Sequence, residues 1–107
     1  MTEPLYITFM WHMHQPYYKD PIMGEYALPW TYLHAVKDYY DMAAIVDETA
    51  GAKAVFNLVP SLLEQIEDYA SGKALDSFLV RGQMAPSDMG EEDRLFILEN
   101  FFSKFIG

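Results

Sequence analysis

The sequence contains no cysteine and few basic residues. The absence of cysteine excludes disulfide bonds, thiolate metal ligands and a catalytic thiol. Only 7 Lys and Arg residues stand against 16 Asp and Glu residues, which gives a formal net charge of -9. Phosphate backbones and anionic membrane surfaces repel a chain with this charge, so we expect neither nucleic acid nor membrane as a partner.

A long uninterrupted apolar segment is also missing. The first four residues carry no basic side chain, and Thr8, His12 and His14 interrupt the apolar stretch that follows. This pattern is unlike a secretory leader or a membrane span. We therefore expect a soluble, cytoplasmic protein, and its 107 residues are enough for one compact core or one piece of a larger domain.

Residues 5–14 alternate between two sets of side chains, which predicts a β-strand. One face carries Leu5, Ile7, Phe9, Trp11 and Met13, and the other carries Tyr6, Thr8, Met10, His12 and His14. We expect the apolar face to pack beneath helices. The opposite face would then present both histidines at the carboxyl end of the strand, where a (β/α) barrel has its site.

The next elements predict a parallel βαβ unit. Residues 15–29 contain three prolines and a glycine and are expected to form a long loop. Residues 31–49 predict an amphipathic helix that ends near Gly51. Residues 52–59 form an apolar run typical of a strand that is buried on both faces of a parallel sheet. The apolar stripe of the helix consists of Leu33, Val36, Tyr40, Ala43 and Val46.

Helices dominate the rest of the chain. Ser61 and Glu64 match a capping box, which predicts a helix that starts beside Pro60 and ends at Ser71-Gly72. Residues 76–81 fit a short helix or a strand, and residues 82–90 predict a loop. Residues 91–106 predict a helix with acidic residues in its first turn and with an apolar face of Leu95, Leu98, Phe102 and Phe105.

These elements predict an α/β fold that is only the N-terminal portion of a barrel. Two strands and three helices are about a quarter of a (β/α)8 barrel of about 250 residues. Two parallel strands alone leave open edges and an apolar face, which proteins usually cover. The end of the chain in an apolar helix, at Phe105-Ile106-Gly107, favours the same interpretation.

His12 and His14 are the first candidates for chemistry. Because they stand two residues apart on a strand, their rings project to the same side. Three interpretations stay open: a metal site completed by Asp20 or Glu25, buried hydrogen bonding, or contact with substrate hydroxyl groups. Flat aromatic side chains cluster around the loop that follows, and such rings offer a surface for the C–H faces of a sugar.

Three ordered stretches resemble glycoside hydrolase family 57. The first is Trp11-His12-Met13-His14-Gln15-Pro16-Tyr17, in which His-Gln-Pro is the hallmark of the first signature region of the family. The second is Leu28-Pro29-Trp30-Thr31-Tyr32-Leu33-His34-Ala35 with Tyr39-Tyr40-Asp41-Met42, and the third is Phe56-Asn57-Leu58-Val59-Pro60-Ser61-Leu62-Leu63-Glu64-Gln65.

The resemblance implies a (β/α)7-type barrel of which residues 1–107 are the incomplete N-terminal part. It implies a retaining enzyme that acts on α-glucans, such as an α-amylase, an amylopullulanase or a 4-α-glucanotransferase, without cofactor or metal. Retaining enzymes need two facing carboxyl groups at about 5 Å. In the family these groups come from later strands, so we expect no catalytic residue within this segment and an inactive isolated chain.

The resemblance implies substrate-binding roles for five residues. His14 is the substrate-contacting histidine, with Gln15 shaping the turn beside it and His12 as a neighbour in the same pocket. Trp30 is a stacking or lid residue, or alternatively packs at the entrance of its helix. Asn57 orients the pocket through hydrogen bonds, or alternatively is a buried structural amide. The expected partners are an α-glucan or maltooligosaccharide and the remainder of the barrel.

Two alternatives remain. A fragment of a metal-dependent polysaccharide deacetylase or mannosidase-like barrel would use bound zinc, although the first strand lacks an Asp. A non-catalytic sugar-binding or interaction module would explain a short chain without catalytic groups. It would have to self-associate through its exposed sheet edges, which the charge of -9 opposes.

Overall fold

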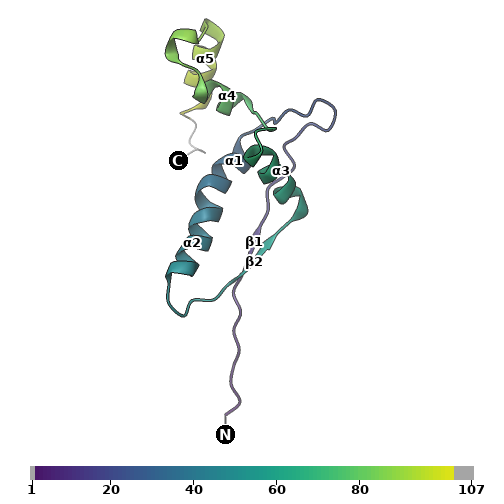
Figure 1. Cartoon of the computed structure of the whole chain (residues 1–107), viewed down its shortest axis with the longest axis vertical. Helices are drawn as coiled ribbons and strands as arrows, with labels where there is room; N and C mark the ends of the chain where they lie inside the picture. Colours follow the sequence, from purple (N-terminus) through teal and green to yellow (C-terminus); the bar gives the residue numbers. More distant parts are fainter. Residues whose placement is uncertain (1, 103–107) are drawn as a thin grey trace.

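The computed structural model of the chain describes residues 2–102, and Figure 1 shows their arrangement. In chain order the elements are β1 (Met10–Met13), α1 (Trp30–His34), a π-helical turn (Ala35–Tyr39), α2 (Tyr40–Glu48), β2 (Val55–Leu58), α3 (Pro60–Ala70), α4 (Ser77–Gln83), a 3-10 turn (Pro86–Asp88) and α5 (Glu91–Asn100).

The two strands form a parallel sheet in which Met10 lies opposite Val55 and Met13 lies opposite Leu58. The helical segment between them makes the crossover that parallel strands require. This confirms the predicted α/β class and its βαβ unit. The described residues contain one two-stranded sheet, so the barrel itself stays a prediction.

β1 is shorter than predicted. Residues 5–9 are not part of it, and the predicted apolar face is largely exposed, with Leu5 at 86%, Ile7 at 70% and Phe9 at 66%. The first hydrogen bond between the strands runs from the Val55 amide to the Phe9 carbonyl. Since β2 is only four residues long, it offers no partner to the residues before Phe9. The length of a strand depends on the strand that pairs with it. The alternating pattern of residues 5–14 continues beyond the residues that β2 can pair with.

The expectation that β2 is buried on both faces is also wrong. Val55 is 43% exposed and Leu58 is 39% exposed. The sheet has no third strand among residues 2–102, and its outer edges are free there. The apolar composition of this run therefore reflects a surface that the described residues do not cover.

The predicted helix over residues 31–49 is one continuous helical segment with a π-helical turn in its middle. It ends at Glu48, and Gly51 then adopts a φ of +79°, a conformation that glycine tolerates best. The predicted stripe is not buried as a whole, because Val36 is 57% exposed and Tyr40 is 69% exposed. The contact with α3 comes from α1, the N-terminal part of the segment.

α3 starts one residue before the predicted capping box. Pro60 occupies its first turn and Val59 is the N-cap residue, without a side-chain cap. Proline at this position has a preformed helical φ and lacks an N–H that would need a partner. Ser61 consequently lies inside the helix, and Glu64 bonds elsewhere, so the predicted capping box is wrong.

The C-terminal part resolves the question left open at residues 76–81. Asp76 caps α4 by accepting from the amides of Phe78 and Leu79, each at 2.8 Å. α4 ends at Gln83, so the loop predicted for residues 82–90 starts after that residue, and it contains a 3-10 turn. α5 has the predicted acidic first turn and ends at Asn100, whereas residues 103–106 of the predicted helix lie outside the described residues.

The predicted apolar face of α5 is not the packed one. Leu95, Leu98 and Phe102 are 55%, 67% and 77% exposed. Phe105, the fourth residue of that face, lies outside the described range. The packed contacts come from aromatic rings, since Phe96 meets the ring of Phe78 at 5.2 Å.

The core lies where the long loop after β1 meets α1, α3 and the start of α4. Its buried apolar residues are Met13, Tyr26, Leu62 and Ala74, and its buried polar residues are Thr31, Gln65 and Asp76. The molecule around this core is open. Its radius of gyration is 18.6 Å, compared with about 13 Å for a compact chain of this length.

The open shape has two visible causes. Figure 1 shows residues 2–9 extending away from the sheet at one end, and α4 and α5 at the other end. Within residues 2–102, none of the helices combines the length and the apolar character that a membrane span requires.

Candidate functional site

Facing residues of the two strands form the first part of the candidate site. His12 lies directly opposite Asn57 in the parallel register. Asn57 Nδ2 lies 3.0 Å from His12 Nδ1. An amide nitrogen donates, so the His12 Nδ1 is the acceptor in this contact. Among the described residues, no hydrogen bond engages the other ring nitrogen of His12.

His14 follows β1 directly, and its ring lies beside that of His12. The two ring centroids are 6.1 Å apart and the ring planes differ by only 9°. This confirms the prediction that residues two apart on the strand project to the same side. Both histidines are exposed, as is Asn57, so the described residues bury none of the three.

Gln15 is held by two tyrosines. Its Nε2 donates to the Tyr39 hydroxyl at 3.0 Å, and its Oε1 accepts from the Tyr18 hydroxyl at 3.2 Å. The Tyr39 hydroxyl also donates to the carbonyl of His14 at 3.3 Å. Tyr39 is the last residue of the π-helical turn, a local geometry that is frequent at functional sites. Burial, followed by the proximity of Tyr39, raises the pKa of the Tyr18 phenol.

Trp30 does not join this cluster. It is the first residue of α1, which follows the long loop along the chain, and it is half-buried. No aromatic pair or hydrogen bond among the described residues connects its side chain to either histidine. The structure therefore brings His12, His14, Gln15 and Asn57 together at one end of the sheet and leaves Trp30 apart.

A metal triad is not assembled in the described part of the chain. Residues 2–102 contain no group of three or more His, Asp or Glu side chains in a position to hold a metal ion. Asp20, one of the two carboxylates considered for such a triad, instead accepts from the backbone amides of Ile22 and Met23. These two bonds hold the pKa of Asp20 below its usual value.

Charged bonds fasten the loop after β1 to α3. Tyr17 donates to Glu64 at 2.7 Å, and Lys19 and Tyr26 donate to the same oxygen of Asp68 at 2.6 Å and 2.9 Å. The bond from Lys19, and then that from Tyr26, holds the pKa of Asp68 below its usual value. Burial first and the Asp68 carboxylate second raise the pKa of Tyr26. These carboxylates anchor the loop.

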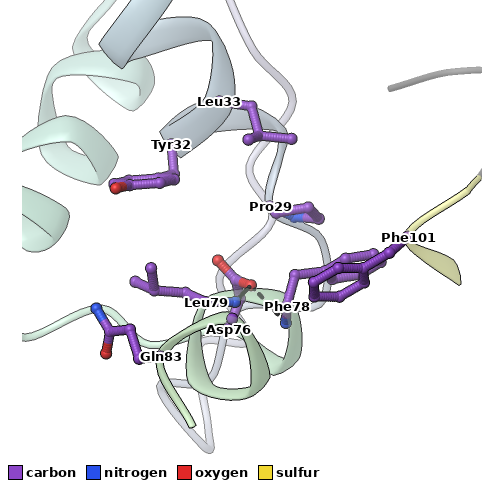
Figure 2. Close-up of a pocket in the computed structure, with 9 residues that line it drawn as sticks. Pro29, Tyr32, Leu33, Asp76, Phe78, Leu79, Gln83 and Phe101 are labelled. Atoms are coloured by element: carbon purple, nitrogen blue, oxygen red, sulfur yellow. Dashed lines mark hydrogen bonds between the residues drawn. The ribbon is translucent and has the colours of Figure 1, made fainter. Parts of the chain in front are cut away.

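An apolar cavity of about 370 Å³ lies apart from the histidines (Figure 2). Tyr32 of α1, Leu79 of α4 and the stacked rings of Phe78 and Phe101 contribute to its walls. Asp76 is its charged member and is already occupied, because its two oxygens accept from two backbone amides and from a tyrosine hydroxyl. Among the described residues that line this cavity, there is therefore no charged group without a partner.

Sequence reasoning missed Tyr18 and Tyr39 as site residues. Tyr39 stands 24 residues from Gln15 in the chain, and only the fold brings them together. Tyr18 lies three residues from Gln15, but it belongs to an irregular loop in which spacing does not predict side-chain direction. The available signals were the aromatic clustering around this loop and, for Tyr39, its place in the second stretch that resembles the family.

Comparison with known proteins gives one finding and two negative results. The family model described as Glycosyl hydrolase family 57 matches residues 8–95. Neither the curated proteins nor the solved structures contain a match to this chain. The matched residues include β1, both strand-end histidines, Asn57 and all the helices up to the first part of α5. Because the match spans most of the chain, this chain belongs to glycosyl hydrolase family 57, a family of glycoside-cleaving enzymes.

Proposed function

We propose that the chain is the N-terminal part of the barrel of a retaining glycoside hydrolase or glucanotransferase that acts on α-glucans. The observation that carries this proposal is the cluster of His12, His14 and Asn57 beside the carboxyl ends of two parallel strands. In (β/α) barrels, substrates bind at that end of the strands.

The chemistry of the cluster suits a sugar. Imidazole and amide groups donate and accept hydrogen bonds, and sugar hydroxyl groups do the same. His12 has one ring nitrogen engaged by Asn57, and among the described residues no hydrogen bond engages the other, which can therefore contact a hydroxyl group. His14 and Gln15 are held in place by Tyr39. We infer that these residues contact substrate, with Trp30 as a stacking or lid residue when further chain is present.

The catalytic pair lies outside residues 1–107 in this proposal. A retaining mechanism needs a nucleophilic carboxylate and an acid about 5 Å apart across the scissile bond. The carboxylates of α3 that contact the loop after β1, Glu64 and Asp68, are engaged by Tyr17, Lys19 and Tyr26. The segment therefore contributes binding, without cofactor or metal, and is inactive alone.

The exposed apolar surface supports a role as part of a larger barrel. The residues before β1 and the outer side of β2 expose large apolar side chains, and these would pack against further strands and helices. Self-association through the free sheet edges is the competing arrangement. Sedimentation of the 107-residue chain distinguishes a self-associated chain from a monomer.

We assign the protein to the cytoplasm.

The test is an assay on maltooligosaccharides with product analysis, using the 107-residue chain and a longer chain that continues to barrel length. We expect activity in the longer chain only, with retention of anomeric configuration. His14→Ala should abolish this activity, and His34→Ala is the matched control because His34 lies on α1 and bonds to Asp38. Activity of the short chain would contradict the proposal, because its own carboxylates would then be catalytic.

A thermal-shift comparison separates the remaining alternatives. Stabilisation by maltooligosaccharides supports a glucan-binding site, whereas strong stabilisation by zinc alone would favour a metal-dependent deacetylase or mannosidase. Binding of oligosaccharide by a longer chain that never cleaves it would favour a non-catalytic sugar-binding module.

A further inference from the structure

The only polar side chain of α3 that is fully buried belongs to Gln65, among the residues that the structure describes. Its exposed fraction is 0%, and it lies in the middle of the helix, next to the buried Leu62. A buried primary amide is costly unless its two N–H groups and its oxygen find partners. The partners of Gln65 therefore define what this residue does.

Gln65 has four hydrogen-bond partners, which satisfy its side chain completely. Its Nε2 donates to the carbonyls of Pro16 at 3.1 Å and of Ser61 at 3.0 Å. Its Oε1 accepts from the amide of Tyr18 at 3.0 Å and from the hydroxyl of Thr31 at 3.4 Å. One side chain thus connects the loop after β1, the start of α1 and the body of α3.

Two of these bonds fix the backbone immediately after the candidate site. Pro16 and Tyr18 lie on either side of Tyr17, and His14 and Gln15 directly precede them. The amide donates to one backbone group of this turn and accepts from the other, so it fixes both the position and the direction of the turn. A charged or apolar side chain of similar size cannot do both.

We propose that Gln65 is a positioning residue for substrate binding, which sets where His14 and Gln15 stand at the end of β1. This inference rests on the function proposed above. Gln65 itself does not touch the substrate. It acts through the backbone of residues 16 and 18, some 49 and 47 residues away along the chain.

The variant that tests this role is Gln65→Leu, which keeps the volume but removes all four bonds. The control is Tyr69→Phe, one turn later in α3, which loses a bond to the buried Asp76 at 2.7 Å but keeps the ring that packs against Tyr26 of the loop after β1 at 5.0 Å. If Gln65→Leu fails to fold, Gln65→Glu replaces it, because glutamate keeps an acceptor for Tyr18 but loses the donor to Pro16.

The Gln65 and Tyr69 variants are compared in two measurements, under conditions in which both have the same free energy of unfolding. The first is hydrogen exchange of the Tyr18 amide in the 107-residue chain, which should become about tenfold faster in the Gln65 variant and stay unchanged in Tyr69→Phe. The second is the kinetics of the longer chain on maltooligosaccharides. We expect KM to rise about tenfold, with a smaller effect on kcat, because uniform binding of substrate is weakened.

Equal effects of the Gln65 and Tyr69 variants on Tyr18 exchange and on KM would overturn the inference and leave Gln65 a purely structural residue. Failure of the proposed function looks different. In that case the wild-type longer chain neither binds nor cleaves maltooligosaccharides, while faster Tyr18 exchange in Gln65→Leu still supports the positioning of the loop.

Discussion

Removal of the Tyr39 hydroxyl is the sharpest test of how the candidate site is held together. Tyr39→Phe deletes two hydrogen bonds, one from Gln15 Nε2 at 3.0 Å and one to the His14 carbonyl at 3.3 Å. Each such bond contributes about 0.5–1.5 kcal/mol net. Because His14 is exposed and Gln15 is half-buried, water can replace the lost partner. We therefore expect a loss near the lower end, about 1 kcal/mol in total.

The assay is urea denaturation of the 107-residue chain, with an unchanged m-value as the sign that the unfolded state is unaffected. Tyr40→Phe is the matched control, since Tyr40 is the adjacent residue of the same helical segment and is 69% exposed. It should change the free energy of unfolding by less than about 0.5 kcal/mol.

A double-mutant cycle isolates the contact itself. Combining Tyr39→Phe with Gln15→Ala should give a coupling energy of about 0.5–1 kcal/mol, since both single variants break the same hydrogen bond. A coupling energy near zero, or equal losses in Tyr39→Phe and Tyr40→Phe, would show that the Tyr39 hydroxyl does not hold Gln15 and His14 in place. The π-helical turn would then have no role in fixing the loop after β1.

Three further predictions concern stability. Leu62→Ala removes a fully buried side chain of α3 and should cost about 2–4 kcal/mol in urea denaturation, whereas Leu63→Ala, at a position that is 48% exposed, should cost less than about 1 kcal/mol. Asp76→Ala removes the N-cap of α4 and should cost about 1–2 kcal/mol, with Asp76→Asn retaining most of the capping effect. The lowered pKa of Asp68 means that its bond with Lys19 stabilises the fold above the ordinary Asp pKa of about 3.9. This stability is lost as the pH falls through the lower pKa of the folded state, so Asp68→Asn should unfold with a weaker acid dependence below about pH 4.

Each of these predictions has a result that contradicts it. Equal losses in the two leucine variants would mean that α3 does not form the core. Equal stability of Asp76→Ala and Asp76→Asn would remove the capping argument. An acid unfolding curve that Asp68→Asn leaves unchanged would show that the bond between Lys19 and Asp68 does not contribute to stability.

Local signals predicted element identity well and element extent poorly. Proline and glycine mark their positions through backbone geometry, so Pro60 opens α3, and Gly51 and Gly72 take positive φ after the helices that they follow. The extent of β1 could not be predicted, because alternation continues through residues 5–9 whether or not a partner strand is present. The capping box failed for a related reason, since Pro60 moved the helix start and placed Ser61 inside it.

The candidate site was predictable in part. Spacing along a strand is enough to place the rings of His12 and His14 on one side, and the structure confirms it. Spacing along the chain does not predict which helix supplies the groups that hold this loop. Tyr39 and Gln65 are such groups; both stand in stretches that resemble the family, but the resemblance does not indicate which backbone groups of the loop they bond.

The α/β class, the order of the elements, the acidic charge and the exclusion of thiol chemistry could all be predicted from the chain alone, because they depend on composition and on periodicities of two to four residues. The partners of the site residues, in contrast, follow only from the folded arrangement. The pairing of His12 with Asn57 across 45 residues follows from strand register, and the bonds that Gln65 makes follow from the packing of α3 against the loop after β1. Such contacts depend on three-dimensional packing, which no local pattern encodes.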